Sequence, residues 1–92
     1  MSTIERQMVI DALDNAGADP DRALRESYSG RAMYGTTCFG ITGSIHEYSA
    51  FLVELTRLDD EEQYASELAM SVRTDDMGRE TIFYFPGIEL ED

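Results

Sequence analysis

Residues 81–85 read Thr-Ile-Phe-Tyr-Phe, and a Pro-Gly pair follows them directly. A run of β-branched and aromatic residues of this length is typical of a β-strand, and a proline followed by a glycine ends one. Because side chains alternate between the faces of a strand, Phe83 and Phe85 share one face while Ile82 and Tyr84 share the other. The strand is therefore apolar on both faces, and we expect it to lie between two covering layers.

Four helices are expected around this strand. Ser2 with Glu5 and Ser44 with Glu47 have the spacing of capping boxes, and apolar residues recur at helical spacing after each pair. The aspartate directly before Pro20 indicates the start of another helix. The acid-rich start of the segment after residue 58 indicates a further helix start. The predicted helices span residues 3–16, 20–28, 45–57 and 60–72, and residues 68–74 are also compatible with a strand.

The remaining segments predict a small sheet. Residues 37–42 are the natural partner of the 81–85 strand, and Gly40 marks a bulge or a close approach of two backbones. Residues 75–78 predict a turn, and the alternating tail after residue 87 either adds a few paired residues or lies loose. The 92 residues thus predict one α+β domain, 1–92, with about four short helices packed on a two- or three-stranded antiparallel sheet.

The strand at 81–85 also predicts a homodimer. We expect Phe83 and Phe85 to meet the helices, through Phe51, Leu55 and Leu68. With so few strands, Ile82 and Tyr84 would then be left in water, which forgoes roughly 1.5–3 kcal/mol for each side chain. A second copy of the chain is the expected cover, with Ile82 and Tyr84 at its interface.

The charge balance limits the class of partner. The chain holds 19 acids against seven basic residues, all of them arginine, for a net charge of −12, and the larger share of the acids lies after residue 46. Such a surface repels nucleic acids and anionic membranes and attracts basic proteins, including the channels of nucleic-acid-binding enzymes. Solubility alone, or adaptation to high salt, explains the same composition.

We expect the acids in two runs, with one neighbour, to bind the partner. They are Asp59, Asp60, Glu61, Glu62, Glu67, Asp75 and Asp76. Neither run has the alternating ligand spacing or the distal glutamate of a calcium loop, and acids at a helix start are usually a solvated cap. No metal site and no cofactor is therefore predicted.

The glycine-rich segment 30–43 suggests an alternative, a small-ligand or nucleotide-binding site. Arg31, Thr36 and Thr37 could hold a phosphate or another small anion beside exposed backbone N–H groups. The segment lacks the lysine and the fixed glycine spacing of a P-loop, and a tight structural loop explains the same residues.

Nucleophilic catalysis would have to use Cys38 and His46, the chain's one thiol and one imidazole. A helix N-terminus beside His46 would lower the basicity of its imidazole, and no third group completes a triad. We therefore predict no enzymatic activity. The chain has neither an apolar span of eighteen residues nor a signal-like start, so we expect a soluble cytoplasmic protein.

Several blocks resemble short uncharacterised proteins found mainly in bacteriophages and their hosts. They are residues 28–35, 38–41, 73–78 and 82–86. The resemblance implies a viral or mobile-element context, and hence host cytoplasm, in which small acidic proteins often disarm host defence by occupying a basic nucleic-acid channel. No settled activity comes with it. The leading hypothesis is a non-enzymatic acidic inhibitor that mimics nucleic acid, and the alternatives are the small-ligand binder and a structural or regulatory dimer module.

Overall fold

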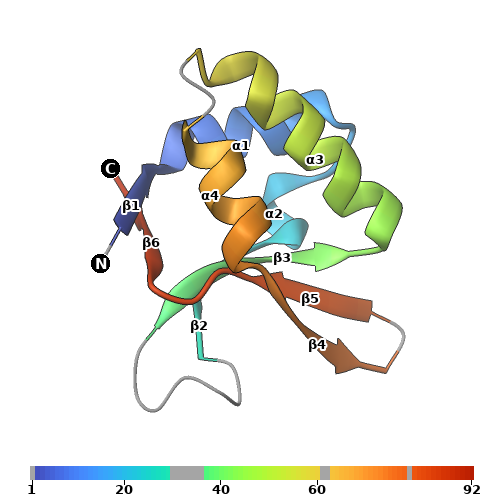
Figure 1. Ribbon diagram of the computed structural model, residues 1–92. Coiled ribbons are helices and arrows are strands. Elements are labelled where there is room, and N and C mark those ends of the chain that lie inside the picture. The colour runs from blue at the N-terminus through green and yellow to red at the C-terminus, as the bar shows by residue number, and fades with distance from the viewer. Residues whose placement is uncertain (1, 30–36, 61–62, 79) are drawn as a thin grey trace.

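The computed structural model describes residues 2–29, 37–60, 63–78 and 80–92. A four-stranded antiparallel sheet has the order β2-β3-β5-β4, and a separate two-stranded parallel sheet pairs β1 with β6. Helices α1, α3 and α4 lie together on one side of the larger sheet (Figure 1). The elements are β1 Ser2–Glu5, α1 Arg6–Asn15, α2 Pro20–Ala23, β2 Leu24–Tyr28, β3 Cys38–Gly43, α3 Ile45–Leu58, α4 Gln63–Ser71, β4 Arg73–Met77, β5 Glu80–Tyr84 and β6 Ile88–Glu91.

Helix α3 begins and lies where the sequence predicts. The Ser44 hydroxyl accepts a hydrogen bond from the backbone N–H of Glu47 at 3.2 Å, and the Glu47 carboxylate accepts one from the Ser44 N–H at 2.9 Å. This reciprocal pair satisfies two N–H groups that a helix start leaves unpaired. The buried residues Tyr48, Phe51 and Leu55 then face the main core.

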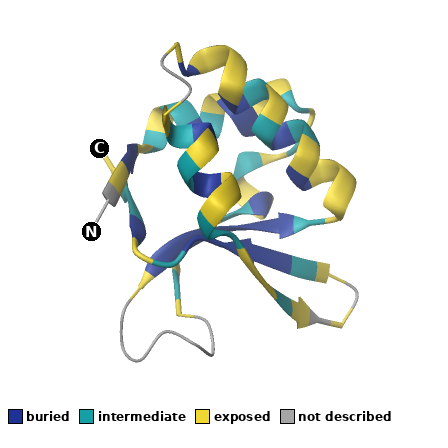
Figure 2. Ribbon diagram, viewed as in Figure 1, coloured by how far each residue is buried: buried dark blue, intermediate teal, exposed yellow. Residues whose placement is uncertain are grey.

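Strand β5 lies inside the sheet, between β3 and β4. Its register against β3 places Gly40 opposite Tyr84 and Ile41 opposite Phe83, as the predicted pairing requires. Phe83 and Phe85 belong to the main core together with Phe51, Leu55 and Leu68, so the prediction for this face is confirmed. Figure 2 shows the buried residues concentrated along β3 and β5.

The predicted strand count is wrong. The larger sheet has four strands, and one of the additions is β4, where we expected the end of a helix and then a turn. The sequence of β4, Arg-Thr-Asp-Asp-Met, is unlike that of a typical strand. Its ladder with β5 stabilises it instead, from Arg73 opposite Tyr84 to Met77 opposite Glu80. Helix α4 ends at Ser71, so the 68–74 segment is helix first and strand afterwards.

The start of the first helix is also wrong. Helix α1 begins at Arg6, and Glu5 is its N-cap residue but makes no side-chain capping bond. Residues 2–5 instead form β1, in which Ile4 lies opposite Leu90 of β6 and is fully buried in the core. Burying Ile4 and pairing its backbone outweigh the local capping signal, because tertiary contacts override weak local preferences.

The second predicted helix, 20–28, is helical only over its first turn. Asp19 caps it as expected, accepting a hydrogen bond from the Asp21 N–H at 3.1 Å. From Leu24 onward the chain is extended and pairs with β3, with Leu24 opposite Ile41 and Tyr28 opposite Cys38. Leu24 and Tyr28 have the i, i+4 spacing of one helix face, but both are residues of the sheet.

The reason for predicting a dimer is contradicted by the burial of Ile82 and Tyr84 within one chain. They are 3% exposed each, and form a second cluster with Cys38 against which Tyr28 packs. The ring centroids of Tyr28 and Tyr84 are 5.1 Å apart. Gly40 makes close packing possible here, because a Cβ at this position would lie 3.3 Å from both Ile82 and Tyr84 atoms. No second copy is needed to cover this face.

Tyr48 provides a stability test of the core. Its ring stacks on Phe83 with centroids 4.4 Å apart, and its hydroxyl is buried without a hydrogen-bond partner among the described residues. Burial also raises the pKa of this phenol. An unpaired buried hydroxyl costs about 1–3 kcal/mol, so we expect Tyr48→Phe to be neutral or to stabilise the domain by about 1 kcal/mol in urea unfolding.

Tyr28 is the matched control for this test. Its hydroxyl donates a hydrogen bond to the Asp75 carboxylate, and partial burial followed by this bond raises its pKa to about 12. Tyr28→Phe should therefore lose about 1–2 kcal/mol, since it leaves a carboxylate without its donor. A loss on Tyr48→Phe as large as that on Tyr28→Phe would show that the Tyr48 hydroxyl is hydrogen-bonded in solution.

Candidate functional site

Asp59, the first acid of the predicted partner-binding run, has an internal role. It is 5% exposed, and its carboxylate accepts hydrogen bonds from the N–H groups of Tyr64 at 2.7 Å and Ala65 at 3.4 Å. Its own backbone N–H donates a hydrogen bond to the Leu55 carbonyl in the last turn of α3. Asp59 thus joins two helices by satisfying donors at the start of α4, and we leave it out of any partner-binding surface.

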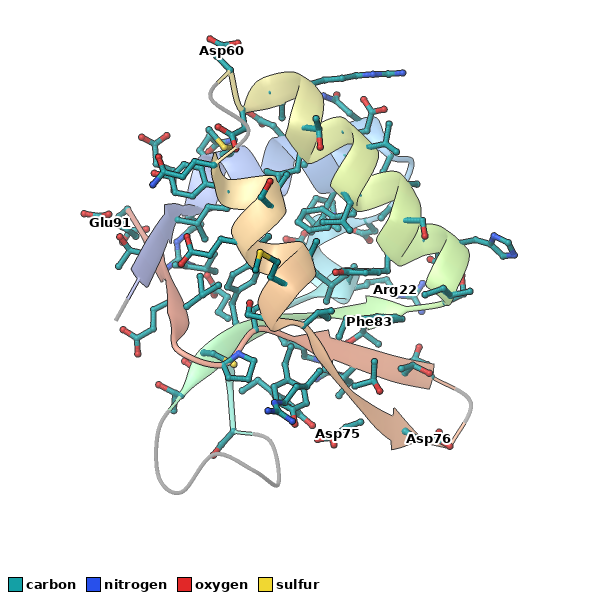
Figure 3. All side chains as sticks on the ribbon, viewed as in Figure 1. Arg22, Asp60, Asp75, Asp76, Phe83 and Glu91 are labelled. Atoms are coloured by element: carbon teal, nitrogen blue, oxygen red, sulfur yellow. The ribbon has the colours of Figure 1, made fainter. Side chains whose placement is uncertain are left out.

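Among the other predicted acids, those that the structure describes do not form one surface. Asp60 lies at one end of the molecule, and Asp75 and Asp76 lie at the opposite end (Figure 3). Asp75 accepts the Tyr28 hydroxyl, and Asp76 accepts the Gly78 N–H at 3.1 Å in the turn after β4. Glu67 is half-buried on α4, and Glu61 and Glu62 lie outside the described residues.

Acids from the two ends of the described chain meet instead at the parallel pair β1–β6. The register places Thr3 opposite Glu89 and Glu5 opposite Glu91, with Ile4 opposite Leu90 between them. Directly paired residues of parallel strands point to the same side, so the apolar pair faces the core and the polar pairs face outward. Glu5 and Glu91 are therefore like charges side by side, an arrangement that costs stability.

Arg6 ties this edge to the neighbouring strand β2. Its guanidinium contacts the carboxylate of Glu26 on β2, and its Nε donates to the Asp92 carboxylate at 2.6 Å. The Thr3 hydroxyl donates to Glu91 at 2.8 Å. These contacts hold β1, β2 and the tail together and leave most of the carboxylate oxygens facing solvent.

Three adjoining hollows continue the negative surface. The first is bordered by α1, α2 and β2, the second shares Glu26 with it, and the third shares Arg6 with the second. Among the described residues that line them, Arg6 is the one cation. We call the carboxylates around these hollows the acidic strip: Glu5, Asp14, Asp21, Glu26, Glu89, Glu91 and Asp92.

A larger hollow lies elsewhere, between α2, the β3–α3 turn and β5. Its volume is about 860 Å³, and Arg22, Glu47, Glu80 and Phe83 are among its lining residues. The Glu47 carboxylate is used in the α3 cap. What remains is the exposed guanidinium of Arg22 and the exposed carboxylate of Glu80, which together are a weaker chemical signal than the concentrated charge of the acidic strip.

The predicted anion site receives no support from the one residue of it that can be placed. Arg31 and Thr36 lie outside the described residues. The Thr37 hydroxyl donates to the Glu89 carboxylate at 3.3 Å, beside the acidic strip. A neighbouring carboxylate disfavours a second anion at this hydroxyl.

Cys38 and His46 do not form a catalytic pair. Cys38 is 1% exposed, burial raises the pKa of its thiol, and its Sγ donates to the Tyr28 carbonyl at 3.6 Å. His46 lies beyond the other end of β3, and the strand from Cys38 to Gly43 spans about 17 Å at its usual rise. A buried thiol whose pKa is raised is a poor nucleophile.

No family of known proteins matches the chain, and neither a curated protein nor a solved structure is significantly similar to it. Within the ranges that the structure describes, no three His, Cys, Asp or Glu residues gather as metal ligands. In the same ranges no helix is long and apolar enough to cross a membrane. The resemblance to bacteriophage proteins therefore stays a prediction.

Sequence reasoning missed the acidic strip because its members lie far apart along the chain. One signal was present: Ile88 and Leu90 alternate with Glu89 and Glu91, as in a strand with one buried face. The matching alternation around Ile4 was assigned to a helix. Without both strands, Asp14, Asp21 and Glu26 could not be connected with the tail.

Proposed function

We propose that this protein is a non-enzymatic acidic binding protein that docks on a basic protein surface through the acidic strip. The observation that carries the proposal is the outward-facing pair Glu5 and Glu91 on adjacent strands of a surface on which Arg6 is the one cation among the described lining residues. Like charges held together are a cost in the free protein that a cationic partner relieves.

The strip also has the properties expected of an electrostatic docking surface. Among the described lining residues, its seven carboxylates face one guanidinium, and Glu26 and Asp92 already contact that guanidinium. A field of this kind speeds the association of a basic partner and weakens as salt is added, over about 8–10 Å at physiological ionic strength. Dispersed acids such as Asp60 and Asp76 contribute to the net charge without adding to this local field.

The partner class that fits best is a protein whose basic surface ordinarily holds nucleic acid, as the resemblance to bacteriophage proteins implies. Charge density limits the form of mimicry. Duplex DNA as long as the protein's 33 Å longest dimension carries about 19 charges, whereas the whole chain has a net charge of −12. The strip is therefore a substitute for a short stretch of backbone phosphates, and we propose inhibition by occupying part of a basic channel.

A charge-matched comparison tests the docking surface. The strip variant Glu5→Gln/Glu89→Gln/Glu91→Gln and the control variant Asp60→Asn/Glu67→Gln/Glu80→Gln have the same net charge. At about 0.5 kcal/mol for each exposed charge, we expect the strip variant to bind a nine-residue lysine peptide about tenfold more weakly than the unmodified chain in calorimetry at low salt. Glutamine keeps an acceptor oxygen for the Thr3 and Thr37 hydroxyls, so the fold is preserved.

The control variant should lose less than about threefold, because its charges are dispersed. Equal losses in the two triple variants would mean that net charge alone attracts the peptide, as in a salt-adapted surface without a binding role. Affinity that stays constant as salt is raised would also contradict the proposal.

A further inference from the structure

The first hollow of the acidic strip combines apolar walls with an acidic border. Its volume is about 430 Å³, and its lining residues are Ile10, Asp14, Pro20, Asp21, Leu24 and Glu26. Half of these side chains are aliphatic and half-buried, and the other three are carboxylates on the exposed side. No basic residue is among the described lining residues. We call this hollow the α1–β2 groove.

Ile10 is the unusual member of the α1–β2 groove. It lies on α1 one turn before Asp14, so the two side chains share a face of the helix. Unlike Leu24, which packs against the main core, Ile10 is not among the residues that form or contact that core. A half-buried isoleucine that does not contribute to the core leaves apolar surface at the base of an acidic border.

The end of α1 strengthens the negative potential here. Asp14 is in the last turn of the helix, which holds no basic residue. A helix C-terminus carries a partial negative charge of about −0.5, and a carboxylate there is unfavourable unless a cation is near. Among the carboxylates of this groove Arg6 contacts that of Glu26, and within the described part of the chain no ion pair involves Asp14 or Asp21.

We propose that the α1–β2 groove receives the side chain of a lysine or arginine from the basic partner, an inference that rests on the proposed function. The aliphatic part of such a side chain lies against Ile10, Pro20 and Leu24. Its charged end reaches the carboxylates at the border. Long basic side chains bury their methylene groups along apolar surface in this way while the charge stays close to water.

A pair of peptides that differ only in the length of the side chain tests the groove. Nine-residue peptides of lysine and of 2,4-diaminobutyrate carry the same ammonium groups, but lysine has two more methylenes. Because burying methylenes is favourable, we expect the unmodified full chain to bind the lysine peptide about five- to tenfold more tightly in calorimetry. Ile10→Ala should bring this ratio close to one.

The matched control is Val53→Ala on α3. Val53 is also an aliphatic helix residue, is 52% exposed and lies outside the groove, so the ratio should remain five- to tenfold in this variant. Circular dichroism verifies that both variants are folded, which we expect because neither residue belongs to the core. The double variant Asp14→Asn/Asp21→Asn should weaken the binding of both peptides.

The outcomes separate this inference from the function on which it rests. If both peptides bind with equal affinity, or if Ile10→Ala leaves the ratio unchanged, the groove does not receive the side chain, although the acidic strip still binds cations. If neither peptide binds, the proposed function fails and the groove inference fails with it.

Discussion

Ile4→Ala is expected to lower the free energy of unfolding by about 2–5 kcal/mol, as aliphatic truncations in a core do. Ile4 is fully buried, joins the main core and lies opposite Leu90 of β6. The substitution removes the side chain that anchors β1, and β1 in turn positions Glu5 in the acidic strip. Urea unfolding measures this loss of stability. We expect the midpoint to fall while the slope of the free energy of unfolding against urea concentration stays unchanged.

Ile45→Ala is the control of the same residue type. Ile45 is 59% exposed at the start of α3, so its truncation should change the stability by less than about 0.5 kcal/mol. If Ile4→Ala were no more destabilising than Ile45→Ala, β1 would not be anchored in the core, and the structural basis of the acidic strip would be lost.

Asp59→Ala is expected to cost about 2–4 kcal/mol, because two backbone donors at the start of α4 lose a carboxylate acceptor in a buried setting. The adjacent Asp60 is exposed, and Asp60→Ala should stay within about 0.5 kcal/mol of the unmodified chain. Thermal and urea unfolding of the two variants make a direct comparison of neighbouring aspartates.

A second variant of Asp59 distinguishes its effect on stability from any effect on binding. We expect Asp59→Asn, which keeps an acceptor oxygen, to recover part of the lost stability and to leave the affinity for the lysine peptide within about twofold, the size of a small electrostatic change. A large loss of affinity in Asp59→Asn with normal stability would return Asp59 to the partner-binding surface.

The predicted parts of the fold are those that local physics decides. The α3 capping box appears as expected, and the paired apolar strands predicted at 37–42 and 81–85 appear as β3 and β5, since each combines a strong local signal with a buried face. The errors have one cause. Ser2–Glu5, residues 24–28 and residues 73–77 are strands because distant segments pair with them, and their own sequences indicate a helix or a turn.

The candidate site could not be predicted for the same reason, because it depends on pairing between distant segments. Counting acids along the chain pointed to the run at 59–62, where the first acid is an internal cap. The acidic strip arises only after β1 pairs with β6, which brings Glu5 beside Glu91 across almost the whole length of the chain. No short segment of the sequence contains both residues. The alternating tail indicated only one of the two strands that form the pair.

Mapping the bound lysine peptide by nuclear magnetic resonance tests the central claim most directly. In a titration of the ¹⁵N-labelled chain at low salt, we predict that the largest amide shift changes occur in β1, β6, the last turn of α1 and the start of β2. The changes should saturate together and diminish as salt is added. Shift changes centred on Asp60 or on Asp75 and Asp76, with the acidic strip unaffected, would contradict the account.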